Sequence, residues 1–110
     1  MPKSIAIIGA SADRIKFGNK AVRAYIQQGW TVYPVNPREE TIEGLPVYRS
    51  VLDIPGDVDL ATFYLLPQVG INVVADLGRK RIPKLLLNPG TESEELIDKA
   101  RQHGLEVESG

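Results

Sequence analysis

The 110-residue sequence has no cysteine and a single histidine, His103. Without cysteine the chain forms no disulfide, no thiolate metal site and no cysteine nucleophile. One histidine excludes multi-histidine metal sites, and it falls in the last turn of a predicted helix, where a cation complements the helix dipole. We therefore expect no metal site, no catalytic residue and a protein that is not an enzyme.

An excess of one charge and long apolar runs are also missing. The formal net charge is -1, so we expect no bulk attraction to nucleic acid or to an anionic membrane. No apolar run approaches the roughly 18 residues that a membrane span needs. The N-terminal residues lead directly into a strand-like run, so we expect no signal peptide and a cytoplasmic protein.

Short apolar runs alternate along the chain with amphipathic stretches of about three turns. The runs predict strands over Ile5–Ile8, Thr31–Val35, Leu60–Leu66 and Lys84–Asn88, and from Leu105. The stretches predict helices over 18–28, from Pro67 to about Leu77, and from a capping box at Thr91–Glu94 to about His103. A turn-rich connection over 36–48 and a short turn capped by Ser50 complete the pattern.

Strands separated by helices of this length form right-handed βαβ units with a parallel sheet. A chain of 110 residues is close to the usual size of one domain. The expectation is a single domain over residues 1–110 with an α/β, Rossmann-like fold: three layers, α/β/α, around a five-stranded parallel sheet.

An open parallel sheet binds its ligands outside the carboxyl ends of the strands. After the first strand come Gly9, Ala10 and Ser11, then a loop with Arg14 and Lys16. Free backbone N–H groups, the start of a helix and nearby cations together favour a phosphate. The other strand ends are followed by Asn36-Pro37-Arg38, by Pro67 and by Asn88-Pro89-Gly90. Each is also an ordinary turn sequence, but four of them at one rim favour a nucleotide-bearing ligand.

The dinucleotide NAD fits this rim poorly. Its fingerprint requires G-x-G-x-x-G between strand and helix, whereas residues 9–14 contain only the first glycine, Gly9. It also requires an acidic residue at the end of the second strand, where this chain has Val35-Asn36-Pro37. A P-loop sequence is absent as well.

Several short motifs occur in order along the whole chain: Gly9-Ala10-Ser11, Lys16-Phe17-Gly18-Asn19, Tyr33-Pro34-Val35-Asn36-Pro37, Glu43-Gly44-Leu45, Tyr48-Arg49-Ser50-Val51, Pro67-Gln68-Val69-Gly70 and Asn88-Pro89-Gly90-Thr91-Glu92-Ser93-Glu94-Glu95. In combination they resemble the stand-alone CoA-binding protein family, which is related to the CoA-binding domain of the succinyl-CoA synthetase α subunit. Members of that family continue beyond the residues that match Val107–Gly110, so we expect either that the fifth strand is incomplete or that a tail has been left off.

The resemblance implies coenzyme A as the cofactor and a role for each motif. Gly9, Ala10 and Ser11 would hold phosphate, before the helix start at Gly18 and Asn19. Arg14, Lys16 and Lys20 would supply charge to the pyrophosphate or the 3′-phosphate, and Asn36, Pro37 and Arg38 would line the adenosine end. Leu66, Pro67 and Val69 would pack against the apolar part of the ligand, and Asn88, Pro89 and Gly90 would close the rim.

Three functions stay open on the sequence alone. The first is non-catalytic binding of CoA or acyl-CoA by a carrier, sensor or regulatory module. The second is an enzyme that uses NAD(P) or another nucleotide, and the third is an interaction module that has lost its ligand. Small domains of this type often form homodimers, but no residue of the sequence identifies such a surface.

Overall fold

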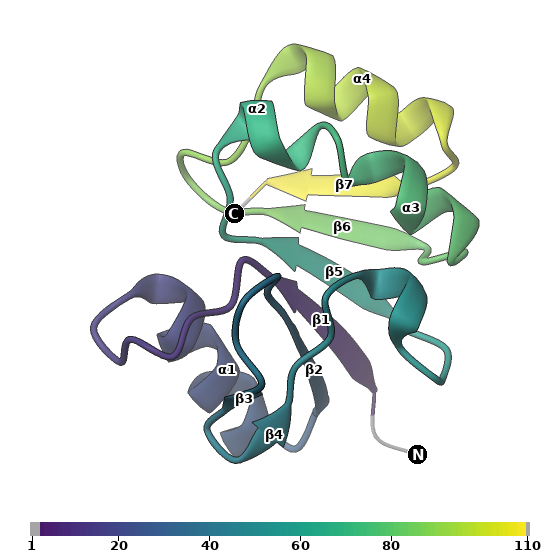
Figure 1. Cartoon of the computed structure of the whole chain (residues 1–110). Helices are drawn as coiled ribbons and strands as arrows, with labels where there is room; N and C mark the ends of the chain where they lie inside the picture. The colour runs from purple at the N-terminus through teal and green to yellow at the C-terminus, as the bar shows by residue number, and fades with distance from the viewer. Residues whose placement is uncertain (1–2, 110) are drawn as a thin grey trace.

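The computed structural model describes residues 3–109, so the expectations for Met1, Pro2 and Gly110 lie outside the described part. Five parallel strands form one sheet in the order β2-β1-β5-β6-β7 (Figure 1). They are β1 (Ser4–Ile8), β2 (Thr31–Val35), β5 (Leu60–Phe63), β6 (Lys84–Leu87) and β7 (Glu106–Ser109). The chain runs outward from β1 to β2 and then returns past β1 to β5. The strand order therefore reverses at β1 and β5, where sheets of this kind bind ligands.

Helices cover both faces of the sheet, which confirms the three-layer α/β/α fold. They are α1 (Phe17–Gln27), the 3₁₀ helix η1 (Val51–Asp53), α2 (Pro67–Gly70), α3 (Val74–Arg79) and α4 (Glu94–Gln102). In residues 3–109 no helix combines the length and apolar character that crossing a bilayer requires.

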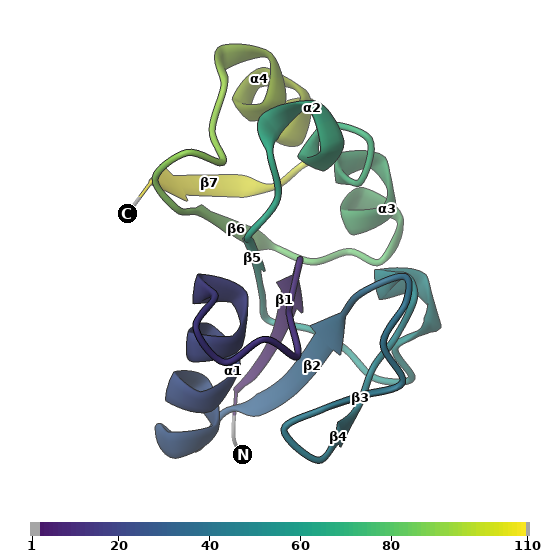
Figure 2. The same cartoon turned by 60° about the vertical axis from the view of Figure 1, so that its left-hand side comes forward.

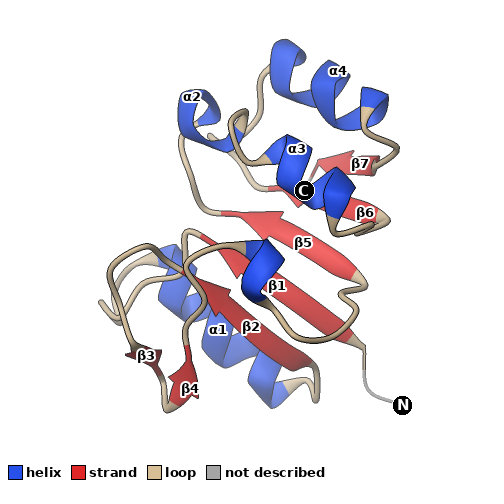
Figure 3. Cartoon of the chain, turned by 45° about the vertical axis from the view of Figure 1, so that its right-hand side comes forward, coloured by secondary structure: helices blue, strands red, loops and turns tan. Residues whose placement is uncertain are grey.

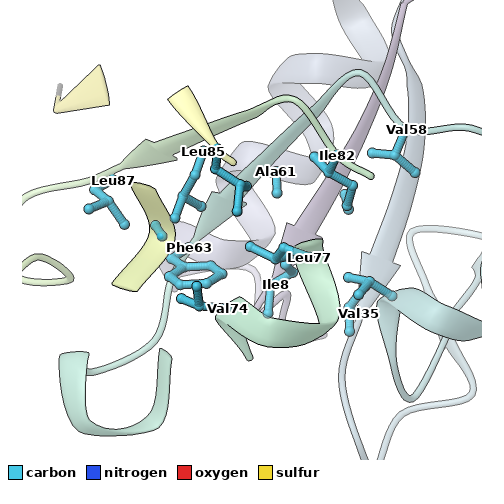
Figure 4. Packing of buried hydrophobic residues seen from close by; sticks show 14 of the residues in the cluster. Ile8, Val35, Val58, Ala61, Phe63, Val74, Leu77, Ile82, Leu85 and Leu87 are labelled. Carbon is cyan, nitrogen blue, oxygen red and sulfur yellow. The ribbon is translucent and has the colours of Figure 1, made fainter. Parts of the chain in front are cut away.

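The interior strand β1, between β2 and β5, is buried from end to end because each of its faces meets a different layer. Ile5 and Ile7 pack with the residues of α1, whereas Ile8 packs with those of α3 and α4. Figure 4 shows the core cluster that contains Ile8, in which Phe63 of β5 lies next to Val74 of α3.

A hairpin that the sequence patterns did not predict lies in the connection after β2. It consists of β3 (Thr41–Ile42) and β4 (Leu45–Pro46), joined by Glu43 and Gly44, whose φ angles are 50° and 79°. Two positive φ angles define a type I′ turn, and Glu-Gly is an uncommon sequence for it. After the hairpin, the Tyr48 N–H donates to the Pro34 carbonyl at 3.0 Å, so this segment runs along the outer side of β2 (Figure 2).

The prediction of one continuous helix from Pro67 to about Leu77 was wrong, because the structure has two short helices, α2 and α3, in its place. Between α2 and α3 the N–H groups of Asn72 and Val73 donate to carbonyls three residues back, which tightens the turn and ends the α-helical pattern. Gly70 packs directly on the Phe63 ring, since a Cβ on Gly70 would lie 3.0 Å from the nearest ring atoms.

Two predicted boundaries shift by two or three residues. The strand expected over 60–66 ends at Phe63, because β5 pairs with β6 only as far as Phe63 and Leu87. The helix cap is Ser93, whose hydroxyl accepts from the Leu96 N–H at 3.1 Å, rather than Thr91, which bonds the Asn88 carbonyl at 2.7 Å. The last strand, β7, pairs with every residue of β6.

Candidate functional site

The loop from Gly9 to Lys16 begins where two backbones meet without room for a side chain. Gly9 has φ +92°, and a Cβ there would lie 2.5 Å from the Tyr64 carbonyl oxygen. A Cβ on Gly18, in the first turn of α1, would collide with the Gly9 carbonyl oxygen. The start of α1 therefore lies directly against the end of β1, as in phosphate-binding turns.

Two side chains of α1 and one that follows β2 hold the carbonyl groups of this loop. Asn36 Nδ2 donates to Ala10 O at 2.8 Å, Asn19 Nδ2 donates to Ser11 O at 2.9 Å, and an Arg23 guanidinium N–H donates to Arg14 O at 2.9 Å. Within residues 3–109 the backbone N–H groups of Ala10 and Ser11 have no hydrogen-bond acceptor. A loop with its carbonyls tied and its N–H groups free is suited to an anion.

Two neighbouring clefts that share lining residues include this loop in their walls. The loops that follow the strands leave the sheet at this edge (Figure 3). The larger cleft has a volume of about 490 Å³ and is lined by residues 8–11, 16, 35–37, 49–51, 64, 65, 69, 73 and 76. The smaller cleft, about 300 Å³, is lined by residues 9, 11, 16–18, 64–66 and 89–91. They share Gly9, Ser11, Lys16, Tyr64 and Leu65, so one extended ligand can pass from one to the other.

A third hollow of about 600 Å³ lies between α2 and the start of α4. Its lining includes Glu94 and Glu95 and no cationic side chain. Two carboxylates repel phosphate, so this hollow does not suit the ligand that the loop at Gly9–Lys16 selects, although it is larger than either cleft.

The charges in the larger cleft are mixed. Lys16 and Arg49 supply cations, and Asp76 supplies a carboxylate. Arg14 lies outside both linings and pairs with Glu43 at 3.5 Å, from a side chain that is 65% exposed. Burial raises the pKa of Tyr64, which lines both clefts, and the charge of Tyr25 raises it further. The Tyr64 phenol therefore stays protonated at neutral pH and remains a hydrogen-bond donor.

Most of the residues that the sequence nominated come together at these clefts. The larger cleft has Gly9, Ala10, Ser11, Lys16, Asn36, Pro37 and Val69 in its wall. The smaller cleft adds Gly18, Leu66, Pro89 and Gly90. Their individual roles in ligand binding stay predictions.

The other nominated residues lie around the clefts rather than in them. Asn19 is fully buried, and Asn88 Nδ2 ties the ends of β5 and β6 together by donating to Thr62 Oγ1 at 2.8 Å and Phe63 O at 2.9 Å. Lys20 Nζ lies 5.1 Å from the centroid of the Phe17 ring. Pro67 lines the third hollow, and Arg14 and Arg38 are exposed beside the loops.

The structure also brings residues to the larger cleft that sequence reasoning did not assign to the site, above all Arg49, Tyr64 and Asp76. Arg49 follows Tyr48, and Tyr48 forms a bridge with Val35 at the end of β2. That pairing carries Arg49 to the rim, but a turn-rich sequence gives no sign of it.

Known proteins resemble this chain over nearly its whole length. A family model described as "CoA binding domain" matches residues 3–110. The α subunit of ADP-forming acetate–CoA ligase II from Pyrococcus furiosus is 32% identical over 117 residues, which cover 96% of this chain and 26% of that subunit. The chain thus spans about a quarter of the length of this relative.

Two solved structures illustrate the same relationship. A conserved hypothetical protein from P. furiosus has a TM-score of 0.90 at 37% identity, covering 100% of this chain and 94% of that one. The apo form of the dinucleotide-forming acetyl-coenzyme A synthetase 1 from Ca. Korarchaeum cryptofilum has a TM-score of 0.84 at 31% identity, covering 96% of this chain and 25% of that one. The chain belongs to the CoA binding domain family, and coenzyme A is the ligand that goes with this assignment.

Proposed function

We propose that the chain binds CoA or an acyl-CoA without catalysing a reaction, as a carrier, sensor or regulatory module. The observation that carries the proposal is the loop at Gly9–Lys16, with tied carbonyls and free N–H groups in the walls of two neighbouring clefts. The pyrophosphate lies at this loop, the 3′-phosphoadenosine lies in the larger cleft, and the pantetheine arm leaves through the smaller cleft. The length of CoA matches two clefts in series better than one.

The apolar residues of the smaller cleft support this direction. Phe17 and Leu66 line it and are 74% and 60% exposed, which leaves their surface available to an apolar chain. Lys16 is the single charged residue in its lining, and it is shared with the larger cleft. The charged part of the site therefore faces the phosphates of the ligand, and the apolar part faces its thioester end.

The position of the histidine His103 supports the absence of catalysis. His103 follows α4 and packs against Gly78, where a Cβ would lie 3.0 Å from His103 Cβ. The end of α4 leads into the start of β7, so His103 lies at the edge of the sheet opposite the clefts. The ligase relatives are about four times as long as the segment they share with this chain, which gives them room for groups that the shared segment does not supply.

Thermal unfolding with CoA, dephospho-CoA, NAD and ATP tests the binding. A ligand at about 100 times its dissociation constant adds roughly 2.7 kcal/mol, which raises the melting temperature of a domain of this size by about 10 °C. Stabilisation by CoA and less by dephospho-CoA is expected. Stabilisation by NAD but not by CoA would favour the nucleotide-dependent enzyme, and no effect from any ligand would favour the interaction module.

A thiol assay tests the absence of catalysis. Acetyl-CoA incubated with the protein is expected to release free CoA at the rate of the buffer control, and addition of ADP and phosphate is expected to change nothing. Accelerated thiol release would overturn this part of the proposal while leaving the binding intact. The proposal places the protein in the cytoplasm, where CoA is available. Sedimentation equilibrium measures whether the protein forms the homodimer that small domains of this type often form.

A further inference from the structure

A carboxylate lines a cleft that otherwise attracts anions. Asp76, in the first turn of α3, and Arg49, just before η1, both line the larger cleft. Within residues 3–109 they form no ion pair with each other. Asp76 Oδ1 instead lies 3.6 Å from Arg79 on the same helix, and its side chain is one-third exposed. The other carboxylate oxygen, Oδ2, accepts no hydrogen bond from residues 3–109.

This carboxylate restricts which part of a nucleotide can lie beside it. A phosphate next to Asp76 would be repelled. Lys16 directly precedes α1 and Asp76 belongs to α3, and these two helices pack in different core clusters, so the cation and the carboxylate come to the cleft from different layers. A carboxylate accepts hydrogen bonds and donates none. The neighbouring part of the ligand must therefore present an N–H or O–H donor.

The apolar residues around Asp76 indicate that this part is flat and aromatic. Val69 and Val73 precede Asp76 by seven and three residues and line the same cleft, together with Val35 and Val51 from the end of β2 and from η1. Aliphatic side chains on two walls suit the faces of a purine ring and leave its edge for a polar group. The adenine edge of CoA carries one strong donor, the exocyclic N6 amino group.

We propose that Asp76 accepts a hydrogen bond from the N6 amino group of adenine and makes the larger cleft selective for adenine over 6-oxopurines. This inference rests on the proposed function, because it takes the 3′-phosphoadenosine of CoA to occupy that cleft. A 6-oxopurine presents a carbonyl oxygen where adenine presents the amino group, so two acceptors would face each other. Sites built around a hydrogen bond reject analogues that leave their polar group unpaired.

Isothermal titration with adenosine 3′,5′-bisphosphate and inosine 3′,5′-bisphosphate tests the proposal, because adenine presents an amino donor at position 6 and an acceptor at N1, whereas hypoxanthine presents an acceptor at position 6 and a donor at N1. A carboxylate that faced N1 instead of N6 would therefore prefer the inosine form, which would overturn the proposal. The wild-type protein is expected to bind the adenosine form on the order of 10-fold more tightly, since a partly exposed carboxylate discriminates less than a buried one. Asp76→Asn is expected to reduce the ratio to about twofold or to reverse it, because an amide also donates to a 6-oxo group.

Asp98→Asn is the matched control, since it makes the same chemical change on the exposed surface of α4, outside the cleft lining. It is expected to keep the wild-type ratio. Melting temperatures of both variants separate the effect on binding from the helix-dipole contribution of Asp76.

The inference alone is overturned by equal binding of the two bisphosphates by a wild-type protein that binds CoA, or by an unchanged ratio in Asp76→Asn. Loss of the Asp76 effect with 2′-deoxyadenosine 3′,5′-bisphosphate would also overturn it, because the carboxylate would then hold the ribose hydroxyl. A wild-type protein that binds neither CoA nor adenosine 3′,5′-bisphosphate overturns the proposed function instead.

Discussion

The side-chain amide of Asn19 donates a 2.9 Å hydrogen bond to the carbonyl oxygen of Ser11, and through this bond helix α1 holds the loop that follows β1. The same nitrogen donates to Glu43 at 3.2 Å, and Asn19 Oδ1 accepts from Arg23 at 2.8 Å. Asn19 is 0% exposed and every polar atom of its side chain is bonded. Asn19 is therefore part of the support of the phosphate loop rather than of its surface.

Replacing Asn19 with alanine is expected to destabilise the protein by about 2 kcal/mol, because the loss leaves a gap at a buried side chain and unpaired, partly buried groups on Arg23 and Ser11. CoA affinity should fall as well, since the loop loses one of its ties. Chemical unfolding and titration measure the two effects. Asn72→Ala is the control: its amide bonds Gln68 O at the exposed surface of α2, and a change below about 0.5 kcal/mol is expected. Equal losses in both variants would contradict the assignment.

Gly18→Ala tests the close approach of α1 to β1. The new Cβ would collide with Gly9 O and lie 3.3 Å from Ala10 Cα, both of which are backbone atoms that cannot turn aside. We expect a loss of about 2 kcal/mol and weaker CoA binding, because the loop must move away from the helix. Gly56→Ala is the matched control, since its Cβ would meet only Tyr33 Oη at an ordinary 3.5 Å. A Gly18→Ala protein as stable as Gly56→Ala would contradict this view of the loop.

The sequence predicted the sheet and the phosphate loop because their signals are local. The bounds of β2 agree with the prediction, and β1 begins one residue earlier than expected, since a buried parallel strand is a continuous apolar run that ends at a turn residue. Gly9-Ala10-Ser11 and the start of α1 lie next to each other in sequence as well as in space. Local pattern was therefore sufficient for these elements.

The remainder of the site depends on pairings between distant segments. Arg49 reaches the larger cleft because Tyr48 bridges to Val35, thirteen residues earlier. Asp76 reaches it because the turn after Gly70, a glycine packed against Phe63, reorients the chain before α3. Neither contact leaves a periodic signal. For the same reason the sequence could not rank the three cations near the loop, Arg14, Lys16 and Lys20, by their distance from the ligand. Of these three, only Lys16 lines the clefts.

Lys16→Gln and Lys20→Gln form a matched pair that tests this distinction. Lys16 lines both clefts, whereas Lys20 lies over the Phe17 ring outside them. Lys16→Gln is expected to weaken CoA binding by about 10-fold at low salt, with a smaller loss at 1 M salt, where the Debye length falls to about 3 Å. Lys20→Gln should change the affinity by less than about twofold. An equal loss in Lys20→Gln would show that distance from the clefts does not decide the contribution of each cation.

Arg49→Gln and Arg38→Gln test which guanidinium recognises the 3′-phosphate. Arg49 lines the larger cleft, whereas Arg38 is exposed, with its backbone N–H bonded to Asn36 Oδ1 at 2.7 Å. Arg49→Gln is expected to lower the affinity for CoA by about 10-fold and to leave that for dephospho-CoA nearly unchanged, because a guanidinium–phosphate contact is lost only from CoA. If Arg38→Gln shows this selective loss and Arg49→Gln does not, the 3′-phosphate is recognised by Arg38, the residue that the resemblance places at the adenosine end.

The raised pKa values of Tyr25 and Tyr64 predict how the stability of the unliganded protein changes at alkaline pH. Burial raises the pKa of both phenols above the usual value of 10.0, and Tyr25 raises that of Tyr64 further. In the unfolded chain the phenols ionise at their ordinary pKa of about 10. The folded state therefore binds these protons more tightly, and its stability is retained below pH 10 and lost as the pH rises toward the folded pKa values. Denaturant unfolding between pH 8 and 11 should show this fall, and Tyr25→Phe/Tyr64→Phe should show a shallower one, since the double variant has removed both groups. A fall of the same steepness in the double variant would assign the alkaline loss to other residues.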